Sequence, residues 1–353
     1  MFVRQAFIAG CPHSREQNVD MDGRRVALAL GSGGARGYAH IGVIAELGDR
    51  GYEIAGVAGS SMGALVGGLH VAGSLDDFAD WAKTLSQSGV LRLLDPAWRG
   101  PGFFRAEKVL DVVRELLGEV QIEKLPIPYT AVTTDLITGK SLWLQRGPLD
   151  AAIRASIAIP GMIAPYIADG RVLTDGGILD PLPVGPLAGA NADVTIAVSL
   201  SGGDSDGTRY RPTDSEPNAA AEWFNRFVRS TSALLETPTA RSVLSRLGAA
   251  GDDEVEEESA ECEMNGDDEA AVAAMAPKLG SFEVMNRAFD VMQAALARHQ
   301  LAAYPPDILI EVPRSSSRSL DFHRAADMIE VGRVLAEQAL DSYEAQYGSD
   351  DDD

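Results

Sequence analysis

The chain has 353 residues, of which 45% are hydrophobic and 23% charged, so it can bury a large core and is not intrinsically disordered as a whole. Its formal net charge is −22, but residues 251–269 hold eleven acids without a base and residues 350–353 hold four more. Taking those fifteen from the 52 acids leaves 37 against 30 bases, an ordinary balance for a soluble protein, and without a basic patch nucleic acid is not an expected partner.

The N-terminal arm, residues 1–23, is polar. Residues 8–11 (IAGC) are similar to a bacterial lipoprotein cleavage box, but residues 4–5 (RQ) interrupt the apolar stretch that such a box requires. Two cysteines, Cys11 and Cys262, cannot make a disulfide framework in a chain of this length. No run reaches the roughly 18 apolar residues of a membrane-spanning helix. These features favour a cytoplasmic location.

The first predicted elements alternate between strand and helix. Residues 25–30 (RVALAL) are a short apolar run that ends at glycines, which predicts a buried strand. Helical periodicity follows at residues 38–50, a second strand at 54–59 and a second helix at 62–71. This order predicts a parallel sheet with helices on both faces.

The next elements continue the same domain up to residue 200. We expect helices at residues 76–85, 106–117 and 149–156, a hairpin-like pair of strands at 129–134 and 140–144, and strands at 171–173 and 193–200. Residues 24–200 are therefore predicted as one domain core.

The composition changes at Ser201. Residues 201–270 combine a Ser/Gly/Asp/Pro-rich connector, a helical pattern at about 223–235 and the acidic run, whose like charges predict disorder. The apolar positions of that helical pattern have two interpretations, namely packing against the main domain or a movable lid that contacts a lipid surface.

The remaining residues return to the core. An amphipathic helix is expected at residues 282–297, a last strand at 308–312 and a closing helix at 321–340. Residues 271–345 are thus predicted to complete the same domain, and residues 346–353 form an acidic tail.

Gly59-Ser60-Ser61-Met62-Gly63 lies where a predicted strand gives way to a predicted helix, which is the setting of a G-x-S-x-G nucleophile elbow. A serine at the tip of such a turn has a strained backbone, and the flanking glycines remove the Cβ atoms that would block the turn. The N-terminus of the following helix stabilises negative charge beside the serine. Ser61 is the candidate nucleophile, although the pentapeptide alone also fits an ordinary tight turn.

Residues 31–37 (GSGGARG) form a second turn between a strand and a helix. Their backbone N–H groups could converge on an oxyanion or cradle a nucleotide phosphate. The pattern lacks the Gly-Lys-Ser/Thr of a Walker loop, and Arg36 stands where a dinucleotide loop needs glycine. An oxyanion loop next to a serine elbow is what acyl transfer requires.

A nucleophilic serine needs a base. Of the five histidines, only His299 and His323 follow Ser61 and the other motifs in the order of an α/β-hydrolase triad. The competing candidate is Asp175 in Thr174-Asp175-Gly176-Gly177, because a partly desolvated carboxylate can also accept a proton. From the residues alone both possibilities stay open.

Taken together, four motifs resemble the patatin-like phospholipases, in particular the bacterial branch similar to neuropathy target esterase catalytic domains. They are the glycine loop 31–37 with residues 38–42 (YAHIG), the elbow 59–63 with residues 64–67 (ALVG), residues 154–160 (RASIAIP) with Pro165, and Asp175-Gly176-Gly177. The likeness covers about residues 25–200. One departure is Ser32, where many relatives have glycine.

The resemblance implies a three-layer α/β/α fold with a mainly parallel central sheet, and a Ser–Asp dyad in place of a triad. It assigns the dyad to Ser61 and Asp175. It also assigns supporting residues, namely Gly59, Met62 and Gly63 in the elbow, Gly176 and Gly177 beside the aspartate, and Gly33, Gly34, Ala35 and Arg36 at the oxyanion hole. No metal or organic cofactor is implied, and the acidic run has no calcium-loop spacing.

The expected function is a serine esterase or lipid acyl hydrolase of the phospholipase A or lysophospholipase type, working through a covalent acyl-enzyme. Its expected substrates are phospholipids, lysophospholipids or related fatty esters, and transient contact with a membrane surface is compatible with them. The alternative is a catalytically silent protein of the same fold that binds lipid or regulates a partner. The sequence does not indicate an oligomeric state.

Overall fold

A computed structural model describes residues 24–93, 102–104, 107–203 and 281–347. The predicted N-terminal arm with its lipoprotein-like box, both cysteines, nearly all of the 201–270 segment and the end of the acidic tail lie outside the described residues. The predicted domain boundaries stay predictions.

The core is an eight-stranded sheet in which the strand order β10-β9-β1-β2-β4-β8-β7 forms the main path and β5 also pairs with β4. The parallel strands are β1 (Arg25–Leu30), β2 (Glu53–Ser60), β4 (Tyr129–Asp135), β9 (Val194–Gly202) and β10 (Ile308–Pro313). The antiparallel strands are β5 (Lys140–Leu144), β7 (Tyr166–Ala168) and β8 (Arg171–Asp175). A separate parallel pair is formed by β3 (Gly102–Phe104) and β6 (Gly161–Ile163).

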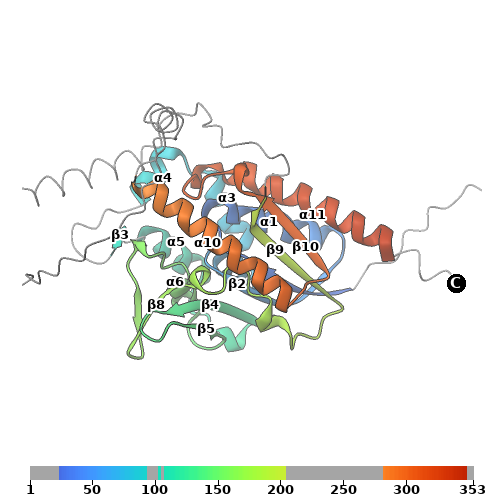
Figure 1. Ribbon diagram of the computed structural model, residues 1–353, viewed down its shortest axis with the longest axis horizontal. Helices are drawn as coiled ribbons and strands as arrows, with labels where there is room; N and C mark the ends of the chain where they lie inside the picture. The colour runs from blue at the N-terminus through green and yellow to red at the C-terminus, as the bar shows by residue number, and fades with distance from the viewer. Residues whose placement is uncertain (1–23, 94–101, 105–106, 204–280, 348–353) are drawn as a thin grey trace, which may run out of the picture.

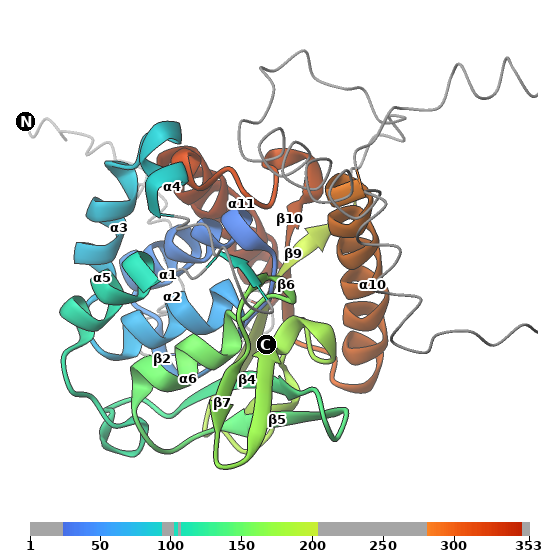
Figure 2. The ribbon, with the colours of Figure 1, turned by 90° about the vertical axis from the view of Figure 1, so that its left-hand side faces the viewer.

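Helices cover both faces of this sheet (Figures 1 and 2). One face carries α1 (Ala39–Asp49), α2 (Met62–Val71), α3 (Leu75–Lys83), α5 (Glu107–Leu117), α6 (Leu149–Ser156) and α11 (Ala325–Tyr347). The short helix α4 (Gln87–Leu93) lies at the end of that layer, and, among the α-helices that the structure describes, α10 (Ser281–Ala303) is the one on the opposite side of the sheet in Figure 2. The arrangement confirms the predicted three-layer α/β/α fold with a mainly parallel sheet.

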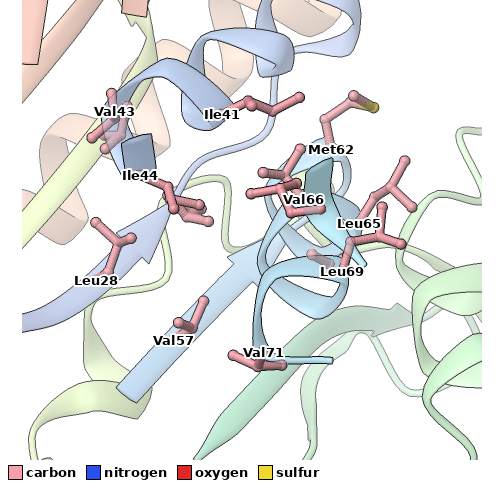
Figure 3. Close-up of a cluster of buried hydrophobic side chains, with 14 of the residues drawn as sticks. Leu28, Ile41, Val43, Ile44, Val57, Met62, Leu65, Val66, Leu69 and Val71 are labelled. Atoms are coloured by element: carbon pink, nitrogen blue, oxygen red, sulfur yellow. The ribbon is translucent and has the colours of Figure 1, made fainter. Parts of the chain in front are cut away.

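The two faces of the sheet differ in side-chain size because neighbouring residues of a strand point to opposite sides. On β1, Leu28 and Leu30 belong to the large cluster formed with α1 and α2, part of which Figure 3 shows. Ala27 and Ala29 belong to a second cluster that includes Ala297 of α10. Small side chains on this face let α10 pack close to the sheet.

The predicted and observed elements agree closely in the first half of the chain. Both α2 and α6 have the bounds that the sequence predicts, and every predicted strand is present. Some corrections are needed. The sequence does not predict helix α4 or the short strands β3, β6 and β7. Helix α10 extends beyond the predicted end at residue 297, and the closing helix begins as a 3-10 turn, Phe322–Arg324, before α11 continues to Tyr347.

None of the helices in the described ranges is both long and apolar enough to cross a membrane.

Candidate active site

Ser61 lies between the end of β2 and the start of α2. Its backbone has φ 55° and ψ −121°, a region that L-residues other than glycine rarely adopt. A Cβ atom on Gly63 would collide with the carbonyl oxygen of Leu30, and one on Gly59 would collide with the backbone of Gly63. Both flanking glycines are therefore required by close backbone packing, as a nucleophile elbow needs.

Asp175 is the last residue of β8, which pairs with β4 in the antiparallel part of the sheet. Ser61 Oγ donates a hydrogen bond of 2.6 Å to Asp175 Oδ2. The other carboxylate oxygen, Oδ1, accepts the Gly177 N–H at 2.7 Å. The two residues that sequence analysis paired are thus in direct contact, and both are buried.

Burial raises the pKa of Asp175 from 3.8 to about 7, and the hydrogen bonds from Ser61 and Gly177 act in the opposite direction. A carboxyl group with a pKa near neutrality can accept a proton and give it back during one reaction cycle. This property suits a general base.

The glycine loop, residues 31–37, follows β1 and lies beside the turn of Ser61, because Leu30 of β1 is in register with Gly59 of β2. The Ser32 N–H donates to the Pro181 carbonyl at 2.8 Å. Gly34 has φ 60°, and a 3-10 turn runs from Gly34 to Tyr38.

The first N–H groups of a helical turn have no partner within the turn, so the Gly33 and Gly34 amides are suitable donors to an oxyanion. The Ala35 N–H is different, since it donates to the Ser319 carbonyl at 2.9 Å. The expectation that Ala35 supplies a third donor is therefore at odds with this geometry.

Arg36 is buried and points into the protein. Its Nε donates to the Gly33 carbonyl at 3.2 Å, and its Nη2 donates to Asp290 Oδ1 at 2.8 Å. The guanidinium group, which the resemblance places at the oxyanion hole, thus orders the glycine loop.

An apolar pocket with a volume of about 100 Å³ opens beside Ser61. Gly34 of the glycine loop and Ser61 both line it. The remaining lining is almost entirely apolar and includes Met62, Leu65, Phe78, Trp81, Val90 and Phe322. Such a pocket suits a hydrocarbon chain attached to a group held at Ser61.

The histidine alternatives find no support in the geometry. The hydrogen bond of Ser61 Oγ goes to Asp175, while His299 is exposed on α10 and His323 lies in the 3-10 turn Phe322–Arg324. His40 is buried and its Nε2 donates to the Gly31 carbonyl at 2.9 Å, with its pKa lowered to about 4 by burial. His40 therefore supports the glycine loop as a neutral side chain.

Several contacts around the site could not be predicted from local motifs. Ser156 Oγ accepts the Ser61 N–H at 2.9 Å and donates to the Val132 carbonyl at 2.6 Å. From α10, Asp290 and Gln293 reach the glycine loop. Ser156 lies in the RASIAIP motif, which the sequence shows, but the motif does not indicate that this side chain contacts Ser61.

Within the described ranges, no group of three or more His, Cys, Asp or Glu residues is placed to hold a metal ion.

A family model and relatives in sequence agree with these features. A family model described as "Patatin-like phospholipase" matches residues 28–188. An uncharacterized NTE family protein of Mycobacterium tuberculosis is 61% identical over 336 residues, which cover 91% of this chain and 92% of that protein. Neuropathy target esterase sws of Drosophila melanogaster is 31% identical over 198 residues, covering 54% of this chain and 14% of that protein. Among solved structures, the crystal structure of VipD from Legionella pneumophila aligns with a TM-score of 0.40 and 14% identity, over 91% of this chain and 67% of that chain.

Proposed function

The chain belongs to the patatin-like phospholipase family, with NTE family proteins among its relatives, and from that premise we propose that it is a serine esterase acting on fatty acyl esters of lipids. The family supports lipid hydrolysis in general terms. For the finer assignment, the observation that carries the proposal is the 2.6 Å hydrogen bond from Ser61 Oγ to Asp175 Oδ2 beside an apolar pocket.

In the acylation step, Ser61 Oγ attacks the carbonyl carbon of the ester and its proton passes to the Asp175 carboxylate. The carbonyl oxygen becomes an oxyanion, which the Gly33 and Gly34 N–H groups stabilise. When the tetrahedral intermediate collapses, the ester C–O bond breaks and Asp175 returns the proton to the departing alkoxide. An acyl-enzyme on Ser61 remains.

Deacylation uses the same groups. Water attacks the acyl carbonyl carbon while Asp175 accepts one of its protons. The bond to Ser61 Oγ then breaks, the proton passes to that oxygen, and a fatty acid leaves. Asp175 ends the cycle ionised, so no group is consumed.

The apolar lining of the pocket supports phospholipids, lysophospholipids or related fatty esters as substrates. Its apolar lining can desolvate an acyl chain, and burial of each methylene group stabilises binding by about 0.8 kcal/mol. A polar head group gains nothing from such a lining and would stay outside it.

A membrane contact is part of the proposal. Val284, Met285, Val291 and Met292 are exposed apolar side chains on α10, and Met285 lies against Gly161 of β6. The next two residues of β6 line the pocket, so this apolar stripe is continuous with the site. We expect Met285→Asp with Met292→Asp to reduce cosedimentation with phosphatidylcholine vesicles while hydrolysis of a soluble ester is retained.

The direct test is hydrolysis of a p-nitrophenyl ester series and of lysophosphatidylcholine by wild type, Ser61→Ala and Asp175→Asn. Both variants should lose at least about 10³-fold in kcat, since each removes a member of one catalytic unit. A matched control is Ser60→Ala, because the Ser60 hydroxyl is buried without a hydrogen-bond partner in the described structure. Circular dichroism checks that all variants fold.

A wild type that is inert to every ester, and that does not react with a fluorophosphonate, would overturn the proposal. The catalytically silent lipid-binding protein would then be the better hypothesis.

A further inference from the structure

Helix α10 contacts the glycine loop through two polar side chains. Gln293 is only 2% exposed, and its Nε2 donates to Ser32 Oγ at 2.9 Å. One turn earlier, Asp290 forms the 2.8 Å ion pair with Arg36. Both contacts join residues more than 250 positions apart in the chain.

The contact with Arg36 determines the direction of one backbone N–H. Arg36 Nε donates to the Gly33 carbonyl oxygen. That carbonyl and the Gly34 N–H belong to the same planar trans peptide, so they point in opposite directions. Fixing the Gly33 carbonyl therefore aims the Gly34 N–H, and Asp290 holds the guanidinium that does so.

The contact with Ser32 acts on the neighbouring peptide. Ser32 is held at its N–H by the Pro181 carbonyl and at its hydroxyl by Gln293. Its own carbonyl shares a peptide with the Gly33 N–H, so anchoring Ser32 at two points limits rotation of that donor.

Gln293 also lies between the glycine loop and the turn that follows Asp175. A Cβ atom on Gly177 would collide with Gln293 Nε2 and with Ser32 Oγ, so the pair packs against the turn whose N–H holds Asp175. A buried amide at this point has little freedom to move.

We propose that Asp290 and Gln293 are positioning residues of the oxyanion hole, which orient the Gly34 and Gly33 N–H groups by holding Arg36 and Ser32. The inference rests on the proposed esterase function and adds to it a part of the chain that lies beyond the family match at residues 28–188. Helix α10 thereby takes part in catalysis without touching the substrate.

The test measures kcat and KM for a soluble p-nitrophenyl ester in Gln293→Leu, Ser32→Ala and the double variant. Gln293→Leu should lower kcat about tenfold, part of what loss of a whole donor costs, with KM within about twofold. Because both side chains act through one hydrogen bond, the double variant should be no slower than the slower single variant.

A second readout separates positioning from a general loss of structure. A trifluoromethyl ketone forms a hemiketal with Ser61, in which the ketone oxygen becomes an oxyanion and the Ser61 proton passes to Asp175. Its inhibition constant should rise in Gln293→Leu by the same factor by which kcat falls. Binding of a fatty alcohol, which forms no oxyanion, should be unchanged.

The matched control is Leu301→Ala on the same helix. Leu301 lies eight positions after Gln293 and is partly buried against the second apolar cluster, so its truncation removes packing and no side-chain hydrogen bond. This variant should lose stability with kcat within about twofold of wild type.

For Asp290, the variant Asp290→Asn leaves the buried Arg36 charge without its partner, so Asp290→Glu is measured beside it. Asp290→Glu should recover more than half of the kcat that Asp290→Asn loses. Failure of Asp290→Asn to fold leaves the Gln293 series to decide.

Unchanged kcat in Gln293→Leu, additive losses in the double variant, or equal losses of kcat in Leu301→Ala would each overturn the inference while the esterase proposal stands. An inert wild type would instead overturn the esterase function, and this inference with it.

Discussion

The turn that carries Ser61 and the glycine loop lie side by side at the ends of β2 and β1, yet their supports come from different parts of the chain. Ser61 is held by Ser156 and by Asp175, both within the matched residues 28–188. The glycine loop has supports within that match, from Pro181 and His40, but it is also held from beyond residue 188 by α10 and by the Ser319 carbonyl.

The kind of support also differs. Around Ser61 the backbone is packed so closely that only glycine fits at positions 59 and 63. The glycine loop is packed as closely, since a Cβ atom on Gly34 would collide with the Ser319 carbonyl, but it depends in addition on polar side chains that cross from another layer of the fold. The nucleophile is therefore fixed locally, while its oxyanion donors depend on the last third of the chain.

The most disruptive change should be Gly63→Ala, which disturbs the close backbone packing around the Ser61 turn. The added Cβ atom would collide with the Leu30 carbonyl oxygen and lie 2.9 Å from that of Gly31. We expect a loss of about 1–3 kcal/mol or more in the free energy of unfolding, measured by urea titration.

The control for that change is Gly48→Ala, in the same fold layer, where a Cβ atom would meet nothing within 4 Å. Alanine in helix α1 should raise stability by up to about 1 kcal/mol. Equal stabilities for the two variants would show that the Ser61 turn is not rigid.

A change of pH should alter the activity through the nucleophile side of the site, that is, through Asp175. Asp175 must be ionised to accept a proton, and burial raises its pKa to about 7. Below that pH, kcat/KM should fall about tenfold per pH unit. Gln293→Leu should lower kcat/KM by the same factor at every pH without moving the midpoint of the profile, because an amide does not titrate. A shifted midpoint would contradict the view that the nucleophile and the glycine loop are supported separately.

Ionisation of the same carboxyl group should raise the activity but lower the stability of the folded protein. The folded protein binds the Asp175 proton more tightly than the unfolded chain, whose aspartate pKa is about 3.9. The contribution of Asp175 to folding is thus most favourable below about pH 4 and is lost as the pH rises to about 7. Asp175→Asn should be more stable than wild type at pH 8, and the difference should shrink toward pH 4.

A smaller effect is expected from Ser156→Ala. This change leaves the buried Ser61 N–H without its acceptor, which should cost about 1–3 kcal/mol in the free energy of unfolding, and the less firmly held nucleophile should lower kcat about tenfold. The rate of fluorophosphonate labelling should fall in parallel. Ser141→Ala is the matched control, because the Ser141 hydroxyl has no hydrogen-bond partner in the described part of the chain; parallel losses in both variants would argue against a specific role.

The sequence predicts the nucleophile side well because its signals are local. Glycines mark both ends of the Ser61 turn, and apolar runs mark β1 and β2. Helix α4 was missed because Ser88 and Gly89 hide its short apolar pattern. The end of α10 was missed because its last turns carry Arg298 and His299, which face solvent and continue no apolar stripe.

The support of the glycine loop could not be predicted in the same way. Asp290 and Gln293 are separated from their partners by 254 and 261 positions, and an isolated acid or amide on a helix has no distinctive spacing. Ser32 departs from the glycine that many relatives have at this position, and only its contact with Gln293 gives the hydroxyl group a role.

The positive φ of Ser61 also has a consequence for how the chain can change over generations. Holding serine in this conformation costs of order 1–3 kcal/mol, a cost that glycine does not carry. Ser61→Gly should therefore melt at a higher temperature than wild type, although it cannot form an acyl-enzyme. A lineage that no longer needed the reaction would gain stability from that single substitution, so a retained serine here is a mark of selection for chemistry.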